Sequence, residues 1–141
     1  MNKRYYSLGL MSGTSLDGVD ASIIASDGEN ELEIVDNCYN KYKSSFKLEL
    51  KKFIDGATTL EYIKKNNNLY NKLEKQLTLN HAEVSKKIIE KNKNINLDFL
   101  GFHGQTILHQ PIKNFSIQMG DPNLLSSLLK KNVYFNFRKN D

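Results

Sequence analysis

The sequence predicts a mixed α/β domain, in which a helical layer packs against a sheet whose first strands are antiparallel. Three observations support this fold class. The 141 residues have the size of one domain and a composition typical of globular proteins, with 39% hydrophobic and 26% charged residues. Short apolar runs bounded by turn residues lie near both ends of the chain, and apolar residues at helical spacing occupy its middle.

Three strands are expected at the start of the chain, over residues 5–11, 21–25 and 32–38. Small polar residues separate the first two runs, and the sequence SDGEN at residues 26–30 is a turn signal before the third. Because tight turns join successive strands, these runs predict an antiparallel meander.

The middle of the chain is predicted to be helical. Apolar residues within 46–54 follow the spacing of one helix face, and Thr58 with Glu61 offers a capping box for a second helix. Residues 69–88 carry one apolar stripe of a longer helix, with lysines elsewhere. His81 lies on that stripe, where we expect it to pack in the core.

The last third of the chain returns to strands, over residues 97–102, 115–119 and 133–137. A helix is expected between the last two strands, because Asp121 can cap it and Pro122 suits its first position.

The basic character of the chain is concentrated in one segment. The net charge is +4, and residues 41–93 hold 13 Lys against 6 acidic residues, whereas the whole chain has only two Arg. Arginine is the side chain that recognises phosphates and bases through paired hydrogen bonds, and this chain has few arginines. A solvated helical surface is therefore the preferred interpretation of the lysines, and nucleic-acid binding is disfavoured.

No apolar run approaches the roughly 18–20 residues of a membrane span. The single cysteine, Cys38, excludes an intramolecular disulfide, and we expect a cytoplasmic protein without membrane contact.

Residues 9–20 (GLMSGTSLDGVD) form the first segment that carries chemistry. It lacks the lysine of a P-loop, and a strand follows it where a dinucleotide-binding fingerprint has a helix. Glycines in a turn let backbone N–H groups approach an anion, and Thr14 and Ser15 add hydroxyl donors. Asp17 or Asp20 could hold Mg²⁺, directly or through water. An ordinary hairpin turn is the alternative.

Two further segments place polar residues at strand ends. Residues 101–111 (GFHGQTILHQP) follow an apolar strand, so His103, Gln105 and Thr106 can form a hydrogen-bonding cluster for a polar ligand. A structural His103 is the alternative. At the end of the chain, Arg138 and Asp141 follow the last expected strand.

Together with residues 118–123 (QMGDPN), these segments resemble the N-terminal part of the anhydro-N-acetylmuramic acid kinase family, within the actin/hexokinase/Hsp70-like (ribonuclease H-like) ATPase superfamily. Residues 9–20 are similar to the family's nucleotide-binding signature, 101–111 to its Gly-Ser-His-Gly-Gln-Thr element, and the tail to its Asp-Phe-Arg-x-x-Asp element. The chain departs from the family where Phe102 stands for Ser, Gln110 for Arg and Asn136 for Asp.

The resemblance implies that residues 1–141 are the N-terminal lobe of a two-lobed sugar kinase whose C-terminal lobe is absent. The isolated chain is therefore expected to be inactive, because such kinases close a cleft between two lobes. The alternative to the enzyme is a non-catalytic half-domain or partner-binding module. In either case an exposed apolar surface would favour self-association, and the sequence leaves open whether the protein forms a homodimer.

The resemblance also implies an activity. Family members use ATP to phosphorylate O6 of 1,6-anhydro-N-acetylmuramic acid while water opens the anhydro ring, which gives N-acetylmuramic acid 6-phosphate in peptidoglycan recycling. By similarity, Asp141 is the base that activates water. The expected sugar contacts are His103, Gln105, Thr106 and Arg138. The expected contacts to ATP, accompanied by Mg²⁺, are Gly13, Thr14, Ser15, Leu16, Asp17, Gly18, Val19 and Asp20.

Overall fold

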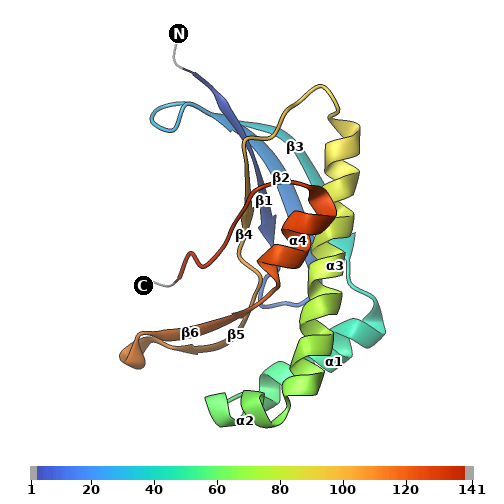
Figure 1. Ribbon diagram of the computed structural model, residues 1–141, viewed down its shortest axis with the longest axis vertical. Helices are drawn as coiled ribbons and strands as arrows, with labels where there is room; N and C mark the ends of the chain where they lie inside the picture. Colours follow the sequence, from blue (N-terminus) through green and yellow to red (C-terminus); the bar gives the residue numbers. More distant parts are fainter. Residues whose placement is uncertain (1–2, 139–141) are drawn as a thin grey trace.

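The computed structural model describes residues 3–138 and has a five-stranded mixed sheet at its centre, in the order β3-β2-β1-β4-β7 (Figure 1). The first three strands form an antiparallel meander, whereas β4 pairs in parallel with β1 and with β7. The mixed α/β prediction with antiparallel N-terminal strands is confirmed. The strands of this sheet are β1 (Tyr5–Met11), β2 (Gly18–Ser26), β3 (Leu32–Lys41), β4 (Phe99–Phe102) and β7 (Val133–Tyr134).

One face of the sheet carries the helical layer. The long helix α3 lies along the sheet and contacts β1, β2 and β3, while α1 and α4 pack against α3 (Figure 1). Thr59, one residue later than predicted, caps α2 by accepting a hydrogen bond from the Tyr62 amide at 3.2 Å. None of the helices within residues 3–138 is long and apolar enough to cross a membrane. The helices are α1 (Ser44–Gly56), α2 (Leu60–Lys65), α3 (Asn67–Lys91) and α4 (Pro122–Leu129).

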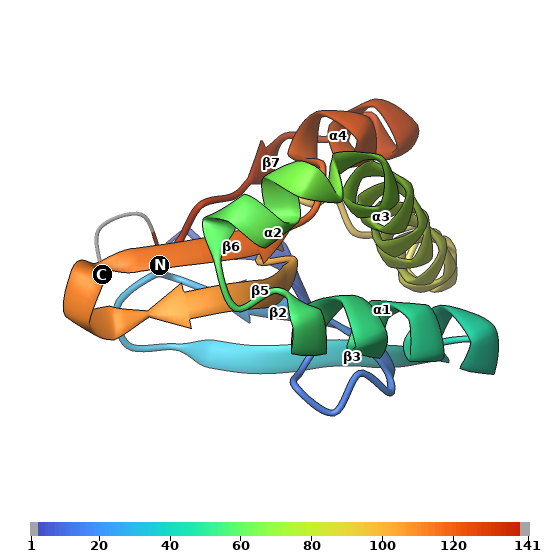
Figure 2. The ribbon, with the colours of Figure 1, turned by 90° about the horizontal axis from the view of Figure 1, so that it is seen from below.

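A separate two-stranded hairpin extends from the end of β4, and its two strands are seen lengthwise in Figure 2. It consists of β5 (Gln105–Gln110) and β6 (Phe115–Met119), joined by a short 3-10 helix over Pro111–Lys113. The sequence pattern predicted β6 but not β5. The register of this hairpin shifts between Thr106 and Leu108, which breaks the alternation that identifies a strand.

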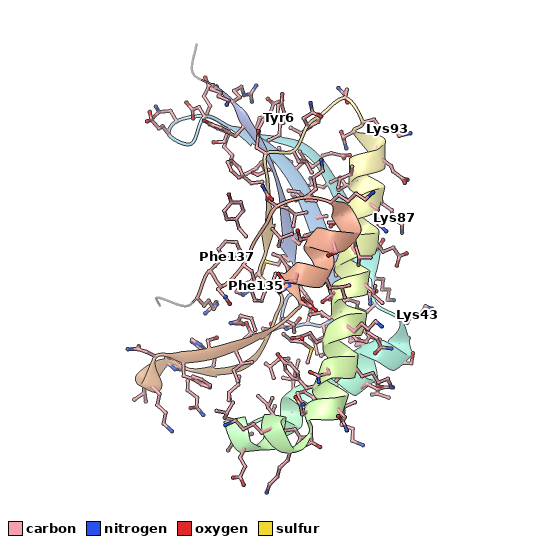
Figure 3. The ribbon with its side chains drawn as sticks, in the orientation of Figure 1. Tyr6, Lys43, Lys87, Lys93, Phe135 and Phe137 are labelled. Atoms are coloured by element: carbon pink, nitrogen blue, oxygen red, sulfur yellow. The ribbon has the colours of Figure 1, made fainter. Side chains whose placement is uncertain are left out.

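The last strand is shorter than the predicted residues 133–137, because Asn136 adopts a left-handed conformation with φ 66°. The left-handed residue directs the rings on either side of it, those of Phe135 and Phe137, to different faces of the sheet. Phe135 packs on Phe102 in the core, with ring centroids 5.3 Å apart, whereas the exposed Phe137 lies over Gly101 on the open face (Figure 3). Asn tolerates this conformation better than most residues.

The two faces of the sheet differ in their packing. Alternate residues such as Leu8, Val19 and Leu100 point toward the helices and are fully buried. The opposite face carries small residues together with the exposed rings of Phe99 and Tyr134. The self-association predicted from a bare apolar surface stays a prediction.

The junction of α3 and α4 is a second buried region. His81 is fully buried as predicted, with Nδ1 2.8 Å from the Leu77 carbonyl oxygen and its ring 4.9 Å from that of Phe102. Burial lowers the pKa of His81 to about 4, so the ring is neutral and Nδ1 donates to the carbonyl. Asp121 caps α4, as predicted, by accepting from the Leu124 amide at 3.0 Å.

Candidate functional site

The turn between β1 and β2, residues 12–17, is held by backbone hydrogen bonds. The Leu16 amide donates to the Gly13 oxygen at 3.1 Å, and the Tyr42 amide donates to the Asp17 oxygen at 2.9 Å. Leu16 has a φ of 57° and a buried side chain, which anchors the turn on the core. The turn is therefore preorganised by its own backbone and by Tyr42, which lies in the link between β3 and α1.

Gly13 of this turn and Gly18 at the start of β2 have different surroundings. A Cβ on Gly13 would meet no heavy atom within 4 Å, so open space lies beside its backbone. A Cβ on Gly18 would overlap the backbone oxygen of Asn40 in the neighbouring strand β3. Gly18 is thus required by strand packing, whereas Gly13 leaves room for a ligand to approach the backbone.

A cavity of about 270 Å³ lies beside the turn and is lined by three segments that are distant in sequence. The turn contributes hydroxyl groups, α1 contributes ammonium groups, and the start of β5 contributes an amide and a hydroxyl. These donors suit an anionic, oxygen-rich ligand such as a phosphate group. One carboxylate, that of Asp55, also lines the cavity, where it is paired with Lys51. The polar residues on the wall are Thr14, Ser15, Lys47, Lys51, Asp55, Gln105 and Thr106.

A buried network joins the turn to β5. The Ser12 hydroxyl donates to Gln105 Oε1 at 2.6 Å and lies 2.8 Å from the Tyr42 hydroxyl. Since Ser12 uses its only proton on Gln105, the Tyr42 hydroxyl donates to Ser12. Burial raises the pKa of Tyr42, which keeps this phenol protonated. The two segments singled out in the sequence, 9–20 and 101–111, are thereby brought together.

The charged groups at the cavity form two ion pairs. Lys47 Nζ lies 2.5 Å from Asp17 Oδ1, and Lys51 Nζ lies 2.9 Å from Asp55 Oδ2. The hydrogen bond and charge of Lys47, with a further hydrogen bond from Ser15, hold the pKa of Asp17 below its usual range. Both ammonium groups thus belong to α1, a helix whose apolar face was predicted and whose lysines were interpreted as a solvated surface.

The segment predicted to bind ATP is divided by the fold. Val19 is fully buried in the core, and Asp20 lies on the exposed, opposite side of β2. Asp17 is the carboxylate beside the cavity residues Thr14 and Ser15. Within residues 3–138, three or more His, Cys, Asp or Glu side chains never gather in a cluster suited to a metal. The donor set fits Mg²⁺ carried by phosphates and water with one protein carboxylate, the usual arrangement for this ion.

The residues predicted to contact sugar are placed in two regions. Gln105 and Thr106 line the cavity, whereas the partly buried His103 lies in the link before β5. Arg138 lines another cavity, of about 220 Å³, together with His109 of the β5–β6 hairpin. Asp141 lies outside the described residues.

The sequence analysis missed four residues of the site. Ser12 lies within a segment that it singled out, but its bond to Gln105 spans 93 residues and has no local signal. Tyr42 follows the third strand without a motif. Lys47 and Lys51 are one helical turn apart on α1, and that i, i+4 spacing is the only signal that could have set them apart from the other lysines.

Comparison with known proteins gives consistent matches. A model of the anhydro-N-acetylmuramic acid kinase family matches residues 4–141. The chain is 51% identical over 141 residues to the anhydro-N-acetylmuramic acid kinase of Pelagibacter ubique, covering 100% of this chain and 37% of that protein. It is 34% identical over 137 residues to the protein of the same name from Brucella canis, covering 96% of this chain and 37% of that protein. The chain thus spans about 37% of the length of these relatives and corresponds to their N-terminal portion.

Proposed function

Because the chain belongs to the anhydro-N-acetylmuramic acid kinase family, we propose that it supplies the phosphate-binding lobe of a kinase for 1,6-anhydro-N-acetylmuramic acid. The reaction uses ATP and water and gives N-acetylmuramic acid 6-phosphate and ADP. The observation that carries the proposal is the cavity of about 270 Å³, at which the turn, α1 and β5 converge. The family implies an actin-like ATPase fold, and residues 1–141 are proposed to be its N-terminal lobe.

The turn is proposed to bind the phosphates of ATP. The backbone beside Gly13 is open to a ligand, and Thr14 and Ser15 present hydroxyl groups at the cavity. Leu16, Gly18 and Val19 act indirectly, since they fix the turn on the core and on β3. Donors that are fixed before the reaction stabilise developing charge without reorganisation, which is the main protein contribution to phosphoryl transfer.

Mg²⁺ bound with ATP would neutralise charge on the phosphates. Asp17 is the carboxylate placed to hold it, through water, because it lies beside the hydroxyl groups of the turn. Asp20 faces the opposite side of β2 and is the less suitable of the two predicted ligands.

The sugar chemistry requires a base. O6 is locked in an ether to C1, so water must form a bond to C1 while the C1–O6 bond breaks. The freed O6 then attacks the terminal phosphorus, and ADP leaves. We propose that Asp141 takes the proton of the attacking water, and that His103, Gln105, Thr106 and Arg138 orient the sugar. Since ATP is the phosphate donor, we assign this step to the cytoplasm, where it consumes an anhydro sugar released from peptidoglycan.

The experiment is a chimera in which residues 1–141 replace the matching segment of the Pelagibacter ubique relative, assayed for N-acetylmuramic acid 6-phosphate. We expect turnover by the chimera and no turnover by the 141 residues alone. Asp141→Asn in the chimera should lower kcat by about two to four orders of magnitude, the range for a positioned base. A folded chimera without turnover, beside an active relative, would contradict the proposal and favour a non-catalytic, partner-binding module.

A further inference from the structure

Lys47 links α1 to the turn at residues 12–17 across 30 residues of sequence. Its ammonium group lies 2.5 Å from Asp17 Oδ1, and its side chain lines the cavity that also contains Thr14 and Ser15. The Lys47 side chain is 40% exposed and that of Asp17 is 54% exposed, so both are accessible to a ligand from solvent.

This ion pair is not needed to hold the turn. The hydrogen bonds from Leu16 to Gly13 and from Tyr42 to Asp17 already fix its backbone, and Leu16 anchors it on the core. Ion pairs between exposed side chains contribute little to folding, because solvent screens them and both side chains lose conformational freedom. A purely structural role therefore leaves the position of Lys47 unexplained.

The balance of charge at the cavity explains the position of Lys47 better. Lys47 and Lys51 are each paired with one carboxylate, of Asp17 and Asp55 respectively, so these four groups have no net charge. A polyphosphate brings several negative charges, and it is attracted more strongly where an ammonium group can turn toward it. Lysine has three N–H donors, so Lys47 can bond to Asp17 and to a phosphate oxygen together.

We propose that Lys47 contacts the terminal phosphates of the nucleotide and that Asp17 holds its ammonium group at the turn. This inference rests on the proposed nucleotide-binding function. A P-loop carries its phosphate-binding lysine within the loop itself. Here the turn has none, and the cation comes from α1, which the meander places beside the turn.

The test measures binding of sodium tripolyphosphate to the 141-residue chain by calorimetry, with a chelator present so that metal ions play no part. Lys47→Met keeps the aliphatic stem and should weaken binding about tenfold, as expected for a lost charge-assisted hydrogen bond. The matched control is Lys72→Met, which removes the same charge from α3 and should change affinity less than about twofold. Lys47→Arg should restore most of the binding.

Asp17→Asn separates the proposed role from a structural one. If Lys47 contacts phosphate, this change frees its ammonium group and should strengthen tripolyphosphate binding about threefold, an effect absent in the Lys47→Met background. If the pair only holds the turn, Asp17→Asn and Lys47→Met should weaken binding equally.

Three results would overturn the proposal: equal weakening by Asp17→Asn and Lys47→Met, equal weakening by the Lys47 and Lys72 variants, or no tripolyphosphate binding by the unmodified chain. Failure of the proposed kinase function would look different. In that case the unmodified chimera would be inactive, although its tripolyphosphate affinity would still depend on Lys47.

Discussion

The turn at residues 12–17 and the α3–α4 junction are both built from segments that stood out as motifs, but their polar groups have different partners. At the junction, the Gly120 amide donates to Glu74 at 3.2 Å, the Asp121 amide donates to Thr78 at 3.0 Å, and the Asp121 carboxylate caps α4. At the turn, hydroxyl and ammonium groups line a cavity. A motif whose polar groups bond to other groups of the protein serves stability, whereas one whose polar groups face a cavity is available to a ligand.

The glycines show the same difference. Gly120 has a φ of 155°, and a Cβ there would lie 2.6 Å from the ring of Phe102, so the junction has no room for a side chain. Gly13 has open space around its backbone. Substitutions in the two regions can test whether the junction serves stability and the turn serves ligand binding.

The largest expected effect comes from a pair of changes at the two ends of the segment 13–18, one in the turn and one at the start of β2. Gly18→Ala should lower the free energy of unfolding by about 3 kcal/mol or more, because the new Cβ overlaps the β3 backbone. Gly13→Val should change the free energy of unfolding by less than about 1 kcal/mol. It should nevertheless weaken Mg·ATP binding about tenfold or more, because the side chain blocks approach to the backbone. Urea unfolding and calorimetry measure the two effects. Comparable losses of stability in both variants would contradict the distinction between these glycines.

His81 provides a pH test of the junction. Its pKa in the folded protein is about 4, below the usual value of 6.5, because burial disfavours the charged ring. Between these pH values the unfolded chain binds more protons, so the free energy of unfolding falls on acidification, by about 3 kcal/mol in full. Urea unfolding at pH 7, 5.5 and 4 measures this loss.

His81→Leu should remove that part of the pH dependence, since the variant has no ring to protonate. Tripolyphosphate binding at pH 7 should be unchanged, because the site and the junction are separate. An equally steep loss of stability in the Leu variant would assign the pH dependence to other groups.

The contrast between the two regions also explains what sequence alone could predict. The Asp121 cap, Pro122 and the apolar stripe carrying His81 are local patterns, and each led to a correct prediction. The turn was likewise identified from its small and hydroxyl residues.

The other side of the cavity was not foreseen, because it depends on contacts between distant residues. Lys47 meets Asp17 across 30 residues, in a chain whose many lysines hide any single one. Strand β5 was missed because its register shifts between Thr106 and Leu108, which interrupts the alternation of apolar and polar residues. Gln105 was singled out as a ligand contact, but its burial and its bond to Ser12 depend on the meander and the hairpin folding together.

The smallest expected effect compares two threonines, changed in the same way. Thr78→Val leaves the Asp121 amide without its partner and should lower the free energy of unfolding by about 1–2 kcal/mol, with tripolyphosphate affinity unchanged. Thr106→Val removes a hydroxyl group from the cavity and should change stability by less than about 0.5 kcal/mol, while weakening tripolyphosphate binding about threefold. Valine has nearly the shape of threonine, so each variant isolates one hydroxyl group. Urea unfolding and calorimetry on both variants give four values. If Thr78→Val weakens binding as much as Thr106→Val does, then the junction and the site are coupled, and the division between them is wrong.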